Sequence, residues 1–251
     1  MKKLLFLITL MPAILVLIVS LARASNQETR SNSVTIAASK DNTLYEDDEG
    51  TLSNGSGEHF FTGKASGRVN DGAIRRGLIA FESLAAIPPG SLILNAELIL
   101  HMSRGTSGTQ PVTLHKIQSN WGEGASDAPG QEGGGTSAML EDATWLHSFF
   151  ADKFWQTPGG DFSATSSAST MVGSVGSYIW SGSGVTNDVR GWFDNPDNNF
   201  GWILVNESSN KTSKRFDSRE NGTAEFRPKL MVTYVPPEQV ERLFLPTILK
   251  D

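Results

Sequence analysis

The strongest constraint on the fold is an alternation of apolar and polar residues with a period of two. In LILNAELILHM (92–102), Leu, Ala and Met occupy the even-numbered positions, while Asn95, Glu97 and His101 lie on the other face. The segment FRPKLMVTYV (226–235) alternates in the same way. Successive side chains of a strand point to opposite faces, so both segments are predicted to be strands with one buried face.

Other short segments rich in β-branched and aromatic residues extend this pattern along the chain. They are VTIAA (34–38), HFFTG (59–63), IRRGLIAFE (74–82), PVTLHKI (111–117), SYIWSG (177–182), NFGWILVN (199–206) and KRFDSRE (214–220). Many short strands of this kind predict an all-β fold, an antiparallel β-sandwich of jelly-roll type.

Helical periodicity is confined to two places. Val185, Val189, Trp192 and Phe193 form an apolar stripe and predict one short helix. The aromatic-rich segment 143–155 is a second candidate for a short helix within a long connection. The Gly- and Ser-rich stretches 122–135 and 159–176 are predicted to be loops.

The N-terminal segment has the composition of a secretory signal. Two lysines precede the apolar run from Leu4 to Leu21, and Ala22-Arg23-Ala24 fits the small-x-small cleavage rule. We therefore expect a signal peptide (1–24), a linker (25–33), one β-sandwich domain (34–235) and a C-terminal tail (236–251). A retained N-terminal anchor is the alternative. After signal removal we expect a secreted protein, extracellular or at the cell surface, with no membrane insertion.

Charge and cysteine content exclude several classes of partner. Without residues 1–24 the chain has 18 basic and 27 acidic residues, a formal charge of −9. This charge disfavours nucleic acid and anionic membrane surfaces, so no nucleic-acid partner is expected. The chain has no cysteine, so neither disulfides nor a cysteine-linked lipid can stabilise or anchor it. Nothing in the sequence indicates an oligomeric state.

The segment RFDSREN (215–221) carries four charged residues between two predicted strands. On a strand, Arg215, Asp217 and Arg219 would share one face, and Glu220 would point toward the core. The structural interpretation has Asp217 neutralised by its flanking arginines. Glu220 would then pair with one further arginine, because an unpaired buried charge is costly. The candidates are Arg75, Arg76 and Arg227.

The alternative interpretation of this segment is a sugar-binding surface. Exposed Arg215 and Arg219, with Lys214, would bind uronate carboxylates, because the guanidinium fork matches a carboxylate. Trp145 and Trp155 flank the aromatic segment and could supply stacking faces for sugar rings. They could equally anchor a long loop against the core.

Metal and catalytic sites are weakly indicated. Asp194 and Asp197 in DNPDNN (194–199) offer oxygen ligands for a structural calcium ion, although the spacing of a standard calcium loop is absent. No other cofactor is expected. The sequence contains neither a nucleophile elbow nor a zinc-binding HExxH motif, so no catalytic residue is assigned and the protein is predicted not to be an enzyme.

Five segments in order resemble the DNRLRE-domain family of secreted proteins. They are KDNTLYEDDEGTLSNGSGEHFFTGK (40–64), RRGLIAFESLAAIPPGSLILNAELILHM (75–102), VTLHKIQSNWGEGASDAPGQEGGG (112–135), DVRGWFDNPDNNFGWILV (188–205) and KRFDSRENGTAEFRPKLMVTY (214–234). The hexapeptide that names the family is absent. The resemblance implies a β-sandwich module related to alginate-type carbohydrate-binding modules.

The resulting expectation is a secreted, non-catalytic module that binds an extracellular, acidic polysaccharide. A structural cell-surface or matrix protein without a small ligand is the first alternative. A polysaccharide lyase or hydrolase is the weaker one.

Overall fold

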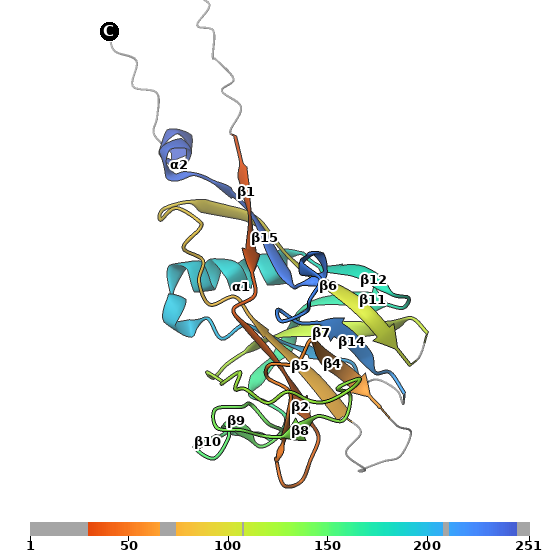
Figure 1. The fold of residues 1–251 in the computed structure, drawn as a ribbon. Helices are drawn as coiled ribbons and strands as arrows, with labels where there is room; N and C mark the ends of the chain where they lie inside the picture. Colours follow the sequence, from red (N-terminus) through yellow and green to blue (C-terminus); the bar gives the residue numbers. More distant parts are fainter. Residues whose placement is uncertain (1–29, 66–73, 107, 208–210, 245–251) are drawn as a thin grey trace, which may run out of the picture.

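The computed structural model describes residues 30–65, 74–106, 108–207 and 211–244 (Figure 1). The predicted signal peptide, with its alternative as an anchor, and the end of the C-terminal tail lie outside these ranges. Within them, no helix combines the length and the apolar character that crossing a membrane requires.

Antiparallel strands dominate the described chain and confirm the predicted all-β sandwich. The longer strands are β1 (Asn32–Ala37), β2 (Lys40–Tyr45), β4 (His59–Lys64), β5 (Ile74–Ala80), β6 (Leu92–Gly105), β7 (Gln110–Ile117), β11 (Phe162–Val172), β12 (Gly176–Trp180), β13 (Trp202–Val205), β14 (Lys214–Asp217) and β15 (Lys229–Val235). The short ones are β3 (Leu52–Ser53), β8 (Thr136–Ser137), β9 (His147–Phe149) and β10 (Lys153–Phe154). The described chain also has two α-helices, α1 (Ser183–Asp194) and α2 (Pro237–Phe244), where one was expected.

Eleven strands form a single sheet that curls into two layers. We call β1, β15, β6, β12 and β14 the first sheet, and β2, β5, β13, β7 and β11 the second sheet. β4 joins them: residues 59–62 pair with β14, while Gly63 and Lys64 pair with β5. β4 therefore belongs to both sheets.

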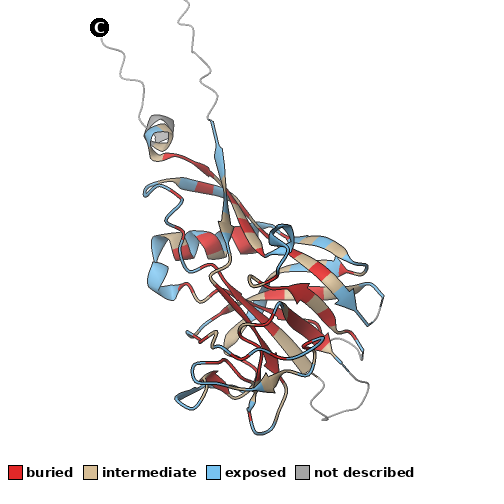
Figure 2. Ribbon diagram, in the orientation of Figure 1, coloured by how far each residue is buried: buried red, intermediate tan, exposed pale blue. Residues whose placement is uncertain are grey.

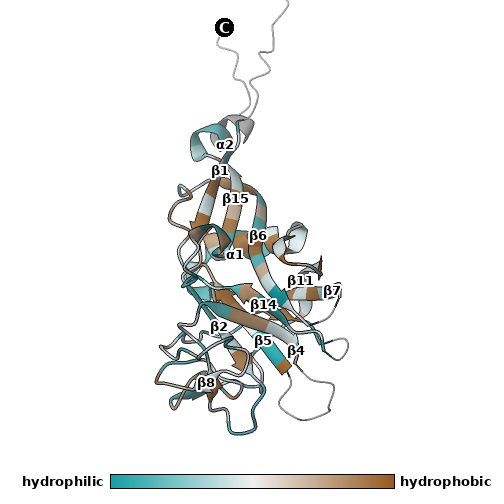
Figure 3. Cartoon of the chain, turned by 45° about the vertical axis from the view of Figure 1, so that its right-hand side comes forward, coloured by the Kyte–Doolittle hydropathy of each residue, from teal (hydrophilic) through white to brown (hydrophobic). Residues whose placement is uncertain are grey.

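The main core lies between the two sheets. Phe60, Leu100 and Phe216 come from the first side, and Ile79 and Trp202 from the second. Along β6 and β15, apolar and hydrophilic segments alternate, as Figure 3 shows. The predicted helix stripe is confirmed, because one side of α1 is buried against this core through Val185, Val189 and Trp192 (Figure 2).

The second sheet buries apolar side chains on both of its faces. Ile79 and Leu204 face the main core, while their neighbours Leu78 and Ile203 face a second cluster with Trp121. The long connection between β7 and β11, which contains β8 to β10, covers this second face. The outer face of the first sheet carries polar side chains such as Glu97, His101 and Thr233, which are partly exposed.

Two predictions of local structure are wrong. Segment 159–176, predicted to be a loop, contains β11, whose Ser, Thr and Ala residues pair with β7. Small side chains suit this strand because α1 packs closely against it. A Cβ added to Gly184 of α1 would lie 2.1 Å from the carbonyl oxygen of Ser167 in β11. Segment 143–155 forms the β9–β10 hairpin instead of a helix, with Ala151 in the left-handed region at φ 65°.

The alternation in β6 also breaks at one point. Leu92 and Leu94 are exposed and Ile93 is buried, which reverses the predicted faces there. The cause is a register shift against β15, where Thr233 pairs with Asn95 but Tyr234 pairs with Ile93. Beyond it, the residues from Ala96 to Met102 alternate as predicted.

Gly63 is required where β4 passes from one sheet to the other. Its φ is +105°, and a Cβ there would lie 2.7 Å from the Thr212 carbonyl oxygen. We expect Gly63→Ala to lower the free energy of unfolding by roughly 2 kcal/mol, because strain and clash add. Gly134→Ala, which meets no atom within 4 Å, is the matched control. Equal urea-unfolding midpoints for the two variants would contradict the assignment.

Candidate functional site

The outer face of the first sheet carries a row of polar side chains across three strands. Asp217 of β14 pairs in register with His59 of β4, and β6 places His101 on its other side. Its carboxylate lies 2.5 Å from His101 Nδ1 and 3.4 Å from His59 Nε2. The residue is only 2% exposed. The partners of Asp217 are therefore two histidines, and not the flanking arginines that the sequence suggested.

The connection after β7 adds an acidic cap to this row. His59 Nδ1 lies 3.0 Å from Glu132 Oε1, and the Asn54 side-chain amide donates to Glu132 Oε2. Burial raises the pKa of Glu132, but the hydrogen bonds from His59 and Asn54 outweigh it and leave the pKa below its ordinary value. Glu132 is thus held as a carboxylate that fixes the His59 ring.

A pocket of about 340 Å³ opens beside His101 and Asp217. The ring of Phe226 stacks on His101, with centroids 3.9 Å apart and planes 9° from parallel. Phe226 is 39% exposed, so this aromatic ring is both fixed and accessible. The remaining lining residues are polar or small: Glu58, Ser103, Asn221, Gly222 and Thr223.

Two guanidinium groups lie next to this pocket. Arg215 Nε donates to the hydroxyl of Ser103, a pocket residue, and Arg215 Nη1 donates to Gln131 Oε1. Arg104 Nη1 donates to the same Gln131 oxygen at 2.7 Å. Of the five residues predicted to bind a ligand, Arg215 is the one that lies beside this pocket.

The other four predicted ligand-binding residues do not join it. Lys214 shares the inner face of β14 with Phe216 and is fully buried, where its Nζ donates to the Gly108 carbonyl and burial lowers its pKa. Trp155 is buried in the second cluster, and Trp145 lies under the Arg76 guanidinium, 4.8 Å from its ring centre. The surface predicted from these residues is therefore not formed.

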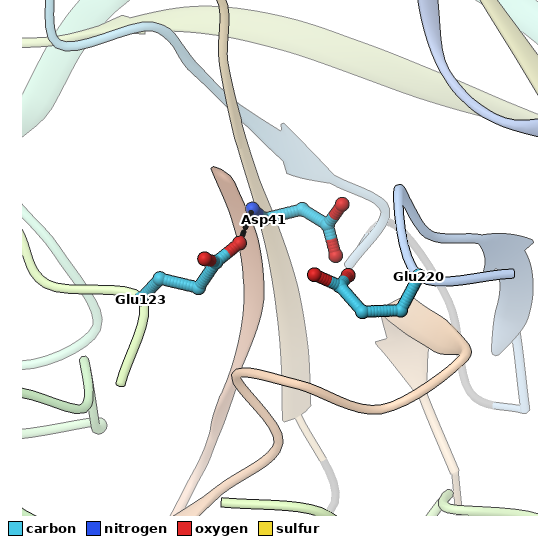
Figure 4. A group of neighbouring side chains, drawn as sticks. All are labelled: Asp41, Glu123 and Glu220. Carbon is cyan, nitrogen blue, oxygen red and sulfur yellow. Dashed lines mark hydrogen bonds between the residues drawn. The ribbon is translucent and has the colours of Figure 1, made fainter. Parts of the chain in front are cut away.

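Arg219 lies elsewhere because β14 ends at Asp217. Ser218 turns the chain, with its hydroxyl donating to the Gly57 carbonyl. Arg219 then enters a group of three carboxylates whose oxygens lie within 4.8 Å of one another: Asp41, Glu123 and Glu220. Figure 4 shows the side chains of Asp41 and Glu220 meeting beside Glu123.

Arg219 bonds to all three carboxylates. Its guanidinium donates twice to Glu123, at 2.7 and 2.5 Å, and forms an ion pair with Glu220 at 2.8 Å. Its backbone N–H donates to Asp41 Oδ2. The arginine that pairs with Glu220 is therefore Arg219, and not Arg75, Arg76 or Arg227. The spacing of the oxygens would suit a cation, and the guanidinium supplies that charge from within the chain.

One positive charge does not balance three carboxylates in a buried place. Burial, and then the charge of Glu220, raises the pKa of Asp41 well above its ordinary value. Burial also raises the pKa of Glu220, followed by the charge of Glu123, and Glu220 Oε2 is a buried atom without a hydrogen-bond partner. The cluster therefore favours protonation of one of its carboxyl groups.

The three other arginines considered for charge pairing hold loops in place. Arg76 forms an ion pair with Glu207, 2.6 Å apart, and donates to the Gly159 carbonyl. Arg75 donates to the Gly133 carbonyl and lies over the Tyr45 ring. Arg227 donates to the Asn221 carbonyl. Each ties a sheet residue or a turn to the neighbouring connection.

The calcium candidates are both exposed. Asp194 ends α1 and Asp197 lies in the following 3-10 turn. Neither belongs to a group of three close metal-ligating side chains in the described part of the chain. Calcium binding there stays a prediction.

Comparison with known proteins adds no relative. No model of a known protein family matches the chain, and no curated protein is similar to it. The resemblance to the DNRLRE-domain family is thus untested.

The carboxylate cluster predicts an unusual pH dependence. Because the folded state raises the pKa of Asp41 and Glu220, it binds protons more tightly than the unfolded chain. The stability that these two carboxyl groups contribute is fully present below about pH 4. It is lost as the pH rises through their pKa values in the folded state. Asp41→Asn keeps the acceptor for the Arg219 N–H but cannot ionise. We expect this variant to be more stable than the native protein at pH 7 and equal to it near pH 3.5.

Urea unfolding at a series of pH values tests this expectation. Asp47 is the control with the opposite sign, because hydrogen bonds from Thr51 outweigh burial and lower its pKa. Asp47→Asn should therefore lower the stability of the protein at neutral pH and leave it unchanged at acidic pH. An Asp41→Asn variant less stable than the native protein at pH 7 would contradict the assignment.

Removing the central charge should be costly. Arg219→Ala leaves Glu123 and Glu220 unpaired, which we expect to lower the free energy of unfolding by roughly 2 kcal/mol after allowing for the partial exposure of Arg219. Arg227→Ala, at an exposed arginine, should cost less than about 1 kcal/mol. Thermal melting of both variants separates these outcomes, and equal shifts would refute the central role of Arg219.

Proposed function

We propose that the protein is a non-catalytic extracellular β-sandwich that binds an acidic polysaccharide in the pocket beside Phe226. The observation that carries the proposal is the exposed ring of Phe226, fixed by its stacking on His101 at a polar pocket. An aromatic face set among hydrogen-bonding groups is the combination that a sugar needs.

The pocket supplies groups for both parts of a sugar ring. The C–H face of a pyranose is apolar and packs on an aromatic ring, while its hydroxyl groups need donors and acceptors. Ser103, Asn221 and Thr223 provide both kinds of group, and Glu58 provides an acceptor. These side chains are held by strands and a short turn, so little order has to be gained on binding.

The preference for an acidic sugar comes from the adjacent guanidinium groups. Arg104 and Arg215 both donate to Gln131 Oε1, which is a neutral amide oxygen. A carboxylate accepts charge-assisted hydrogen bonds that are stronger than those to an amide. A uronate carboxylate can therefore replace Gln131 between the two arginines while the sugar ring lies on Phe226.

Affinity electrophoresis against alginate, other polyuronates and neutral glucans tests the proposal. We expect Phe226→Ala to weaken binding of the acidic glycans roughly tenfold, corresponding to the loss of one aromatic contact. Arg215→Ala should weaken binding of acidic glycans alone. Phe154→Ala removes a more exposed aromatic ring on β10 and serves as the matched control. Melting temperatures should stay unchanged in all three variants.

The same experiment distinguishes the other roles. Five of the six tryptophans are buried and the sixth is covered by Arg76, an arrangement that favours a structural surface protein as the second candidate. Absence of binding to every glycan would favour that role. Release of unsaturated oligosaccharides from a polyuronate would instead indicate a lyase and overturn the non-catalytic assignment.

A further inference from the structure

A second arrangement of reactive groups lies at the start of β2, on residues outside the pocket. Lys40 is 8% exposed, and its Nζ lies 3.2 Å from Asn120 Oδ1 and 2.7 Å from Glu82 Oε1. The Trp121 carbonyl accepts a further hydrogen bond from Nζ at 2.8 Å. An amine, a side-chain amide and a carboxylate thus meet at one point.

The Lys40 side chain is buried and the backbone at Glu82 is held in place, while the side chains of Asn120 and Glu82 reach Lys40 from the surface. Lys40 pairs in register with Ala80 of β5, and the Glu82 backbone N–H donates to the Ser39 hydroxyl. The Trp121 ring lies 4.6 Å from Lys40 Nζ and is fixed by its own hydrogen bond to the Phe200 carbonyl. The amine of Lys40 is therefore held beside its two reaction partners before any reaction.

The carbonyl group of Asn120 is polarised by a backbone donor. Its Oδ1 accepts the backbone N–H of Trp121 at 2.8 Å, which identifies the oxygen and polarises the carbonyl. The same N–H would stabilise negative charge on that oxygen when Cγ becomes tetrahedral, as donors in an oxyanion hole do. The polarised Cγ is bonded directly to the oxygen that Lys40 Nζ contacts.

From this geometry we propose that Lys40 and Asn120 join in an intramolecular amide bond, with release of ammonia and with Glu82 transferring the protons. Glu82 takes a proton from the Lys40 ammonium, and the free amine attacks Asn120 Cγ. The bond from Cγ to Nδ2 then breaks. Of the three ammonium protons, one stays on the new amide nitrogen and two pass to Nδ2, which leaves as ammonium. No group is oxidised or reduced, and Glu82 is regenerated.

The cross-link would stabilise a chain that contains no cysteine. It ties the second strand to the residues directly after β7, across 80 positions of sequence. A covalent tie between such distant residues restricts the unfolded chain and so favours the folded one. Reaction requires the folded arrangement, so the bond forms only after the two sheets have assembled.

Mass spectrometry of the purified full chain tests the proposal. The intact protein should weigh less than its sequence requires by one molecule of ammonia, and a proteolytic digest should contain a branched peptide joining Lys40 to Asn120. Lys40→Arg keeps the positive charge without a primary amine and should abolish both signals. Glu82→Gln should slow their appearance at least tenfold. Lys116→Arg, at an exposed lysine of β7, should change neither.

Two results would overturn the proposal. One is a native chain that keeps the full mass and yields no branched peptide after prolonged incubation in the folded state. The other is loss of ammonia that persists in Lys40→Arg, because Asn120 would then be cyclising onto its own backbone. A circular dichroism spectrum of Lys40→Arg equal to that of the native protein shows that the variant is folded and keeps either result interpretable.

Discussion

The two-sided burial of the second sheet determines the arrangement of the rest of the molecule. Leu78 and Ile203 face away from the main core, and water would otherwise cover them. The long connection between β7 and β11 removes this apolar surface from water, and Trp121 and Trp155 fasten it there. Because hydrophobic burial is the main favourable term in folding, this connection is a structural layer and more than a surface loop.

That layer brings polar and charged groups to sites that the two sheets alone would not form. It places Glu123, Gln131 and Glu132 in hydrogen-bonding contact with Arg219, Arg215 and His59, respectively. Each contact joins residues more than 70 positions apart. The carboxylate cluster therefore contains a residue of this connection, while the pocket beside Phe226 is only bordered by it, through Arg215 and His59.

Sequence reasoning predicted the fold class and the buried faces of β15 and of β6 from Ala96 onward, because alternation records burial directly. It could have placed Lys214 correctly, since this residue has the same parity as Phe216 and must share its inner face. It could not foresee that β14 ends at Asp217, because Ser218 is held by Gly57 and Glu58, far away in the sequence. The register shift that buries Ile93 and exposes Leu94 is likewise set by β15.

The candidate site was harder to predict than the fold. Arg215 was identified, but His59 and His101 meet Asp217 only through strand pairing, and Glu132 reaches His59 only through a distant loop. Phe226 was predicted to begin a strand. It lies instead in a short 3-10 turn, and that turn is what brings its ring over His101. β11 was missed because Ser, Thr and Ala give no hydrophobic signal, although they suit a strand that a helix approaches closely.

The membership of β4 in both sheets has a consequence for how the protein unfolds. Its first four residues hydrogen-bond with β14 and its last two with β5. Neither sheet can separate without pulling away a strand that the other one needs. The two layers therefore form a single cooperative unit. Partial opening of one layer is disfavoured, and the whole domain unfolds in one step.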